Sequence, residues 1–78
     1  MRYYIELHEA STDRWRRLHT LPLTMSEAAG LMKSYHRMVE EEGLTLDKGY
    51  IVPQNKDLPT HEWDHSQGRW NNLRGRRV

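Results

Sequence analysis

Residues 23–44, LTMSEAAGLMKSYHRMVEEEGL, hold the strongest structural pattern in the chain, and the rest of the fold can be placed around them. Thr24 and Glu27 form the pattern T-x-x-E, a capping box in which each side chain bonds a free backbone amide of the first helical turn. Leu23, just before the cap, can pack onto Ala28. The pattern therefore predicts a helix that begins near Met25.

The same stretch also carries a signal for where the helix ends. Gly43 suits the left-handed position after the last turn, and Leu44 can fold back toward Val39, as in a Schellman cap. Between these two ends, apolar residues recur at helical spacing and predict a single buried face. That face comprises Ala28, Leu31, Met32, Tyr35, Met38 and Val39.

Three other segments have the character of β-strands. Near the N-terminus, apolar and polar side chains alternate with the period of two that is typical of a half-buried strand. Residues 15–21 form a second β-like run with imperfect alternation, close enough to the first to pair as a hairpin. Residues 49–52 form a third, which Pro53 limits to an edge or ends. The alternating residues of the first strand are Tyr3, Ile5 and Leu7 on one side and Tyr4, Glu6 and His8 on the other.

Together these elements predict an α+β fold of ββαβ order. The expected sheet has three antiparallel strands in the order 2-1-3, with the helix on one face. Residues 1–54 would form this core domain, and residues 55–78 a polar, arginine-rich, largely irregular C-terminal segment. Because one helix covers one face, the opposite face should be wet or occupied by a partner. It would carry Tyr4, Glu6 and His8, with Trp15 or Tyr50 beside them.

Composition narrows the classes of protein that fit. The 78 residues suffice for one small domain, and the mean hydropathy of −0.98 is low for a folded chain. There is no cysteine, so neither a disulfide nor a thiolate metal site can stabilise the fold. No stretch approaches the roughly 20 apolar residues that span a bilayer. These features predict a cytoplasmic protein that makes no membrane contact and needs no cofactor.

One short string could specify catalysis. Residues 61–71, HEWDHSQGRWN, resemble the zinc-binding signature of the metzincin peptidases, which implies two histidine ligands, His61 and His65, with Glu62 as general base. Two departures oppose this interpretation. Asn71 stands where that family has histidine or aspartate, and Asp64 places a charge inside the motif. We therefore interpret the resemblance as fortuitous, and expect a protein that is not an enzyme, with no catalytic residue.

Charged and aromatic residues instead suggest surfaces for binding. The net charge is only +1, but basic and acidic residues are clustered. Arginine mixed with tryptophan can hold phosphates and stack on bases, although a solvated tail, or one folded back on the acidic run, would explain the C-terminal cluster equally well. The expected partner-binding residues are Trp15, Arg16 and Arg17; Glu40, Glu41 and Glu42; and Trp63, Arg69, Trp70, Arg74, Arg76 and Arg77.

In length, ββαβ order, lack of cysteine and a capped T-x-x-E-A-A helix with an acidic end, the chain resembles small accessory proteins of bacteriophages, including anti-CRISPR proteins. The resemblance covers roughly residues 2–52 and implies a non-catalytic inhibitor. Its partner would be a host protein complex that handles nucleic acid, including a nucleoprotein complex, with acidic side chains imitating phosphates. Direct binding of RNA or DNA by the C-terminal arginines is the alternative, and a minimal zinc peptidase is the third. The oligomeric state is left open.

Overall fold

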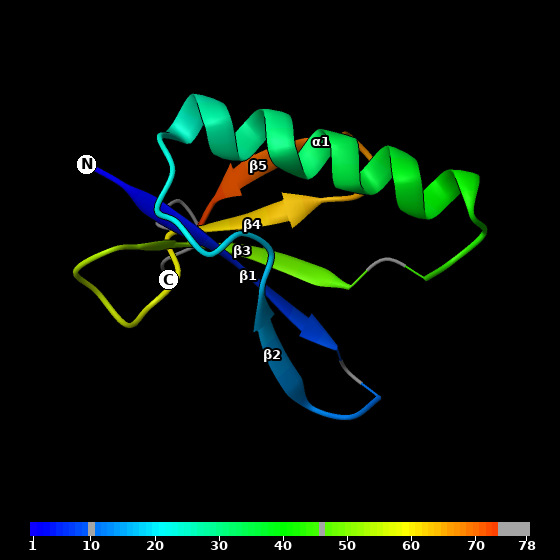
Figure 1. Ribbon diagram of the computed structural model, residues 1–78, viewed down its shortest axis with the longest axis horizontal. Helices are drawn as coiled ribbons and strands as arrows, with labels where there is room; N and C mark the ends of the chain where they lie inside the picture. Colours follow the sequence, from blue (N-terminus) through cyan, green and yellow to red (C-terminus); the bar gives the residue numbers. More distant parts are fainter. Residues whose placement is uncertain (10, 46, 74–78) are drawn as a thin grey trace.

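The computed structural model describes residues 1–9, 11–45 and 47–73, and these form one antiparallel sheet with a single helix against it (Figure 1). The α+β class is thus confirmed, but the element order is ββαβββ. The elements are β1 (Tyr3–Glu9), β2 (Arg14–Arg17), α1 (Met25–Glu41), β3 (Lys48–Pro53), β4 (His61–Asp64) and β5 (Arg69–Asn72).

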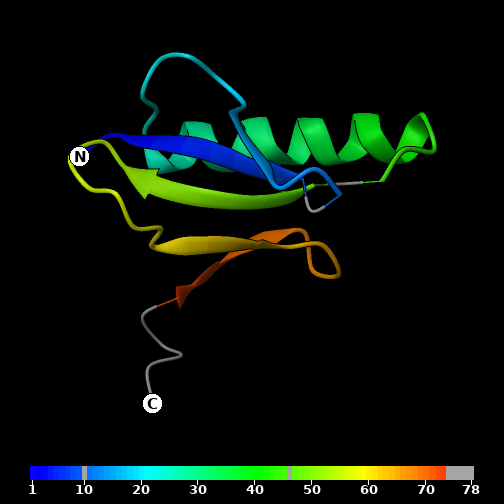
Figure 2. The ribbon, with the colours of Figure 1, turned by 90° about the horizontal axis from the view of Figure 1, so that it is seen from below.

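The sheet contains five strands in the order β2-β1-β3-β4-β5, and every neighbouring pair is antiparallel. The predicted order 2-1-3 is found in the β2-β1-β3 part of this sheet, but the prediction of only three strands was wrong. Figure 2 shows β1, β3, β4 and β5 following one another across the sheet, with α1 alongside. Since β3 pairs with both β1 and β4, it is an interior strand and not an edge, and the other predicted role of Pro53 holds, because β3 ends there.

The extra strands come from the segment expected to be irregular. In β4 and β5, Trp63 lies opposite Trp70, and the two rings meet edge to face with centroids 5.1 Å apart. The turn between the strands is built on Asp64, whose carboxylate accepts bonds from the backbone amides of Ser66 (3.0 Å) and Gln67 (3.2 Å). Local turn chemistry and a cross-strand aromatic pair together favour a hairpin over the short helix that H-E-x-x-H suggested.

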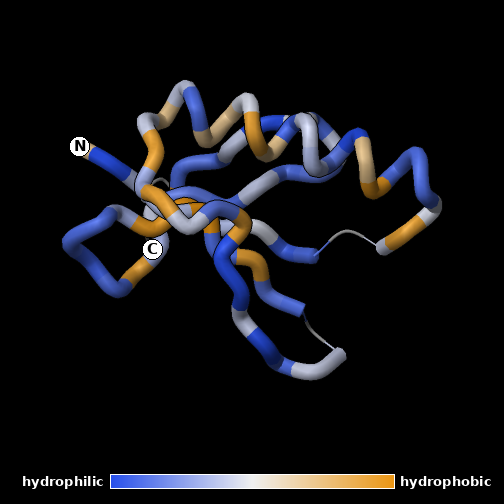
Figure 3. The backbone as a smooth tube through the Cα atoms, viewed as in Figure 1, coloured by the Kyte–Doolittle hydropathy of each residue, from blue (hydrophilic) through white to orange (hydrophobic). Residues whose placement is uncertain are grey.

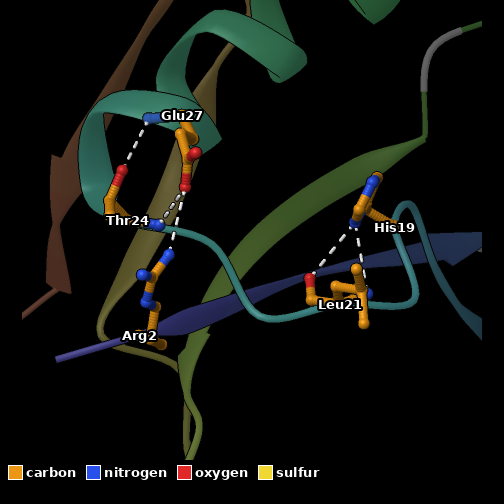
Figure 4. A network of polar contacts seen from close by, with 5 residues as sticks. All are labelled: Arg2, His19, Leu21, Thr24 and Glu27. Atoms are coloured by element: carbon orange, nitrogen blue, oxygen red, sulfur yellow. Dashed lines mark hydrogen bonds and ion pairs between the residues drawn. The ribbon is translucent and has the colours of Figure 1, made fainter.

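The helix follows its predicted capping signals closely. Glu27 donates its backbone amide to the Thr24 hydroxyl at 3.2 Å, and its carboxylate accepts from the Thr24 amide at 2.8 Å (Figure 4). At the other end Gly43 has φ +69°, and the amide of Leu44 donates to the carbonyl of Val39 at 3.0 Å, the long bond of a Schellman cap. Both ends of the helix are therefore confirmed.

The core lies between α1 and the facing side of the sheet. In Figure 3, hydrophobic and hydrophilic residues alternate along the helix, as expected for a helix with one buried face. Met38 departs from the predicted face, because 46% of its surface is exposed. The buried cluster consists of Ile5, Leu7, Ala28, Met32, Ile51 and Trp63.

The second strand is shorter than predicted. It ends at Arg17, and beyond it Leu18 packs against the core while its amide donates to the carbonyl of Ile5 at 2.9 Å. Trp15 and Leu18 cannot face the same side of a regular strand, because side chains alternate. The strand therefore stops where Leu18 must turn inward.

We expect Trp63→Ala to lower the free energy of unfolding by about 3–5 kcal/mol, because the substitution empties a core position that is 3% exposed. Trp15→Ala, at a position that is 57% exposed, should lower it by no more than about 1.5 kcal/mol, the size expected for loss of surface aromatic contacts. Urea denaturation followed by circular dichroism measures both. Equal, small effects would mean that β4 does not belong to the core.

Candidate functional site

The sheet has one face that no described helix covers. Side chains alternate along a strand, so the neighbours of the buried Ile5, Leu7 and Ile51 point away from α1. We call this the open face, and its predicted members Tyr4, Glu6 and His8 do lie on it, with both Trp15 and Tyr50. By strand register the open face consists of Tyr4, Glu6 and His8; Trp15 and Arg17; Lys48, Tyr50 and Val52; Glu62 and Asp64; and Arg69 and Asn71.

Aromatic rings gather at the β2 side of the open face. The ring of Trp15 lies 4.6 Å from that of His8 and 5.5 Å from that of Tyr50, measured between centroids. His8 of β1 and Tyr50 of β3 lie on the same side of the edge strand β2, so they contact the indole from that side, and 57% of Trp15 stays exposed. The indole is thereby held in a fixed place while much of its surface meets solvent.

Beside this cluster, Arg17 makes two contacts at once. Its guanidinium carbon lies 3.8 Å above the ring of Tyr4, a cation–π geometry, and its Nε donates to the Glu6 carboxylate at 2.8 Å. Two contacts on one long side chain fix its position better than either alone. The pair also places opposite charges together, so it adds little net charge to the face.

A groove of about 490 Å³ on the open face is lined in part by Glu6, Trp15 and Arg17. One side is formed by Trp15 and Arg17 of β2, and the other by the loop between β3 and β4, where 75% of Leu58 is exposed. We call this the open-face groove, and its volume falls within the range of small ligand sites. Its lining residues are Glu6, Trp15, Arg17, Val52, Lys56, Asp57, Leu58 and Pro59.

Arg16, which the sequence placed with Trp15 and Arg17 in one binding cluster, lies on the other side of β2. It donates to the Tyr35 hydroxyl at 2.8 Å and to the carboxylate of Asp47 at 2.9 Å. These bonds tie the edge strand to the helix and to the segment before β3. The structure therefore gives Arg16 an anchoring role and leaves Trp15 and Arg17 facing solvent.

The remaining predicted binding residues are dispersed. Trp63 is buried and Trp70 packs against it, so neither ring forms an open surface. Arg69 is exposed and pairs in register with Asp64. The acidic residues Glu40, Glu41 and Glu42 are exposed at the end of α1 and do not line the open-face groove. The arginines Arg74, Arg76 and Arg77 lie outside the described residues.

The metal-binding interpretation of HEWDH is not compatible with the hairpin. On a helix the two histidines would be neighbours about 6 Å apart, but along an extended strand the same separation spans about 13 Å. His61 shares a 2.8 Å hydrogen bond with Thr60, whereas the ring of His65 lies 6.2 Å from that of His36. Within residues 1–9, 11–45 and 47–73, no group of three or more potential ligands could hold a metal ion.

The groove contains residues that sequence reasoning did not select. Lys56, Asp57 and Leu58 were placed in an irregular segment, and Val52 was read only as part of a strand. The alternation of β3 carried a usable signal for Val52, because it lies on the opposite side from Ile51. No local pattern indicates that the loop at Leu58 meets the β2 side of the sheet, since the two are far apart in the chain.

Comparison with known proteins adds no relative. A scan against protein-family models found no match, and searches of curated proteins and of solved structures returned no similar chain. In the described part of the chain, no helix has the length and apolar character needed to cross a membrane.

Asp64 should make the hairpin sensitive to acid. Hydrogen bonds from the Ser66 hydroxyl and then from the Asn71 amide lower the pKa of Asp64 from 3.8 to about 2. A lowered pKa means that the ionised form stabilises the fold, fully above about pH 4 and progressively less as the pH falls through 2. We expect Asp64→Asn to be less stable than wild type at pH 7 and the difference to vanish near pH 2. Denaturant unfolding across this range measures it, and a constant difference would contradict the assignment.

Zinc binding provides a separate check on the hairpin. Equilibrium dialysis with zinc should show no stoichiometric ion, and His61→Ala and His65→Ala should behave like wild type, because His61 begins β4 whereas His65 follows its last residue. One ion per chain, lost in both variants, would mean that residues 61–65 adopt the helical arrangement instead.

Proposed function

We propose that this protein is a non-catalytic binding protein whose open face engages another protein. The observation that carries the proposal is the presentation of Trp15, an indole held by His8 and Tyr50 at the side of the open-face groove. Tryptophan is among the residues most often responsible for binding energy at interfaces. A side chain held in place before binding also loses less conformational entropy on association.

The charges of the open face support a protein partner over a polyanion. Arg17 is paired with Glu6, and Arg69 lies opposite Asp64 in the hairpin register. Lys56 and Asp57 adjoin one another in the groove lining. A surface that holds single-stranded nucleic acid has a strongly positive track along the backbone. Because basic groups here stand beside acidic ones, a partner that presents an apolar side chain framed by mixed charges fits better.

The class of partner follows from the resemblance to small phage proteins. On that basis we propose an inhibitor that acts in the host cytoplasm by occupying a host protein complex that handles nucleic acid. The exposed run Glu40, Glu41 and Glu42 supports this partner class, since neighbouring carboxylates can occupy a site that receives phosphates. The indole would then provide the anchor and the acidic end of α1 a second contact.

Direct binding of nucleic acid is the second candidate. The guanidinium of Arg17 lies 3.8 Å from the centroid of the Tyr4 ring, and Trp15 lines the same groove, so these groups could belong to a stacking platform. The C-terminal arginines would then supply the contacts to phosphate. A steep dependence of affinity on salt concentration would identify this mode.

Affinity capture tests the proposed function. Immobilised protein should retain a stoichiometric complex from a bacterial lysate, and Trp15→Lys should weaken binding of that complex at least about 30-fold, as for loss of a central interface aromatic. Binding of the purified complex would be measured by biolayer interferometry.

Leu21→Lys is the matched control, because Leu21 is 65% exposed, does not line the open-face groove and precedes α1, away from its acidic end. It should bind like wild type. Equal loss in both variants would remove the open face from the proposal. Capture of no protein, together with salt-dependent binding of a labelled oligonucleotide, would favour the nucleic-acid alternative.

A further inference from the structure

We propose that Asp13, acting through His8, is a positioning residue that fixes the Trp15 indole in the orientation used for binding. The inference rests on the proposed function, because it takes the indole as the side chain that contacts the partner. It adds the cause of the fixed orientation, which is a carboxylate in the turn between β1 and β2. Asp13 itself does not line the open-face groove.

The indole of Trp15 leans over the sheet instead of projecting straight into solvent. Trp15 is on β2, and its ring lies 5.5 Å from that of Tyr50 on β3, two strands away. Because neighbouring strands are about 4.8 Å apart, the indole must reach across β1 to make this contact. His8 of β1 pairs with Trp15 in register, and their ring centroids are 4.6 Å apart. The orientation of the indole therefore depends on where the His8 ring lies.

The His8 ring is held by the turn that follows β1. Its Nε2 lies 2.8 Å from a carboxylate oxygen of Asp13. An ionised carboxylate only accepts hydrogen bonds, so Nε2 carries the proton and donates it to this bond. The bond selects one tautomer of the imidazole and restrains the rotation of the ring. Asp13, His8 and Trp15 thus form a continuous series of contacts from the turn to the open face.

Asp13 occupies a backbone conformation that favours glycine. Its φ is +54°, and within residues 1–9, 11–45 and 47–73 every other residue with a positive φ is a glycine. An aspartate has a conformational cost there that a glycine would not have. The ion pair with His8 offsets little of this cost, because 89% of the Asp13 side chain is exposed. Folding stability thus does not account for the aspartate, whereas its bond to the ring beside Trp15 gives it a role.

The order of the indole can be measured in the free protein by NMR relaxation of the Trp15 Nε1–H group. We expect an order parameter of about 0.85 in wild type, as for rigid groups, and below about 0.6 in Asp13→Gly. Asp13→Asn should behave like wild type, because an amide oxygen accepts the same bond and asparagine tolerates positive φ. The midpoint of urea denaturation should be unchanged or raised in Asp13→Gly, since glycine suits this φ.

Affinity for the purified host complex is the functional readout. Asp13→Gly should weaken binding about 3- to 10-fold, the loss expected when a side chain has to be ordered on association. In a His8→Phe background the same substitution should cause no further loss, because Asp13 acts through His8. Thr12→Ala is the matched control and should resemble wild type in every measurement. Thr12 belongs to the same turn, but its hydroxyl donates to Glu9 at 2.6 Å, and Glu9 lies on the other side of β1 from His8.

An indole that stays ordered in Asp13→Gly overturns the inference. So does a loss in Asp13→Asn as large as in Asp13→Gly, or a fall in stability that parallels the loss of affinity. Unchanged affinity with a disordered indole also overturns it, and leaves the proposed function intact if Trp15→Lys still weakens binding. If no complex is captured, the proposed function fails, and the relaxation measurement still decides whether Asp13 orders the indole.

Discussion

The layered arrangement depends on the packing of the buried face of α1 against β1 and β3, where Met32 lies close to the backbone of Gly49. A Cβ atom at Gly49 would lie 2.9 Å from the Met32 Cε and 3.5 Å from a methyl carbon of Leu7. Glycine thus lets the methionine side chain of α1 lie directly on the backbone of the sheet. With the helix fixed over the centre, Ile5 and Ile51 are sealed beneath it, and Trp63 extends the core toward β4. Because α1 covers one face of the sheet, no described helix is left to cover the opposite face.

Those parts of the fold that depend on neighbouring residues could be predicted from the sequence. The capping box of Thr24 and Glu27 and the cap at Gly43 each act within a few residues, so their patterns carry the full physical cause. The same holds for β1, where alternation shows which side chains share a face. From this pattern Tyr4 was placed on the open face. In each case the local preference and the packed structure agree.

The β4–β5 hairpin and the open-face groove could not be predicted in this way, because they depend on contacts between residues that are distant in the sequence. The histidines of HEWDH have helical ligand spacing, but Trp63 gains more by packing under α1 opposite Trp70 than a short polar helix could offer. Asp64, read as a misplaced charge in a metal motif, instead organises the turn through four hydrogen bonds. Trp15 and Leu58 likewise line the same groove, although they are far apart in the sequence, and no local sequence pattern predicts this.

The alternation of β2 has a further consequence for how the sequence can change. Arg16 points toward α1 and holds the strand in place, whereas its neighbours Trp15 and Arg17 point toward solvent. The side chain that attaches β2 to the fold and the side chains that face solvent therefore alternate along this four-residue strand. Substitutions at the outward positions can therefore change the surface of the open face without removing the bonds by which Arg16 attaches β2 to the rest of the fold. A single-residue insertion in the preceding turn would exchange the two roles, and selection should act against it.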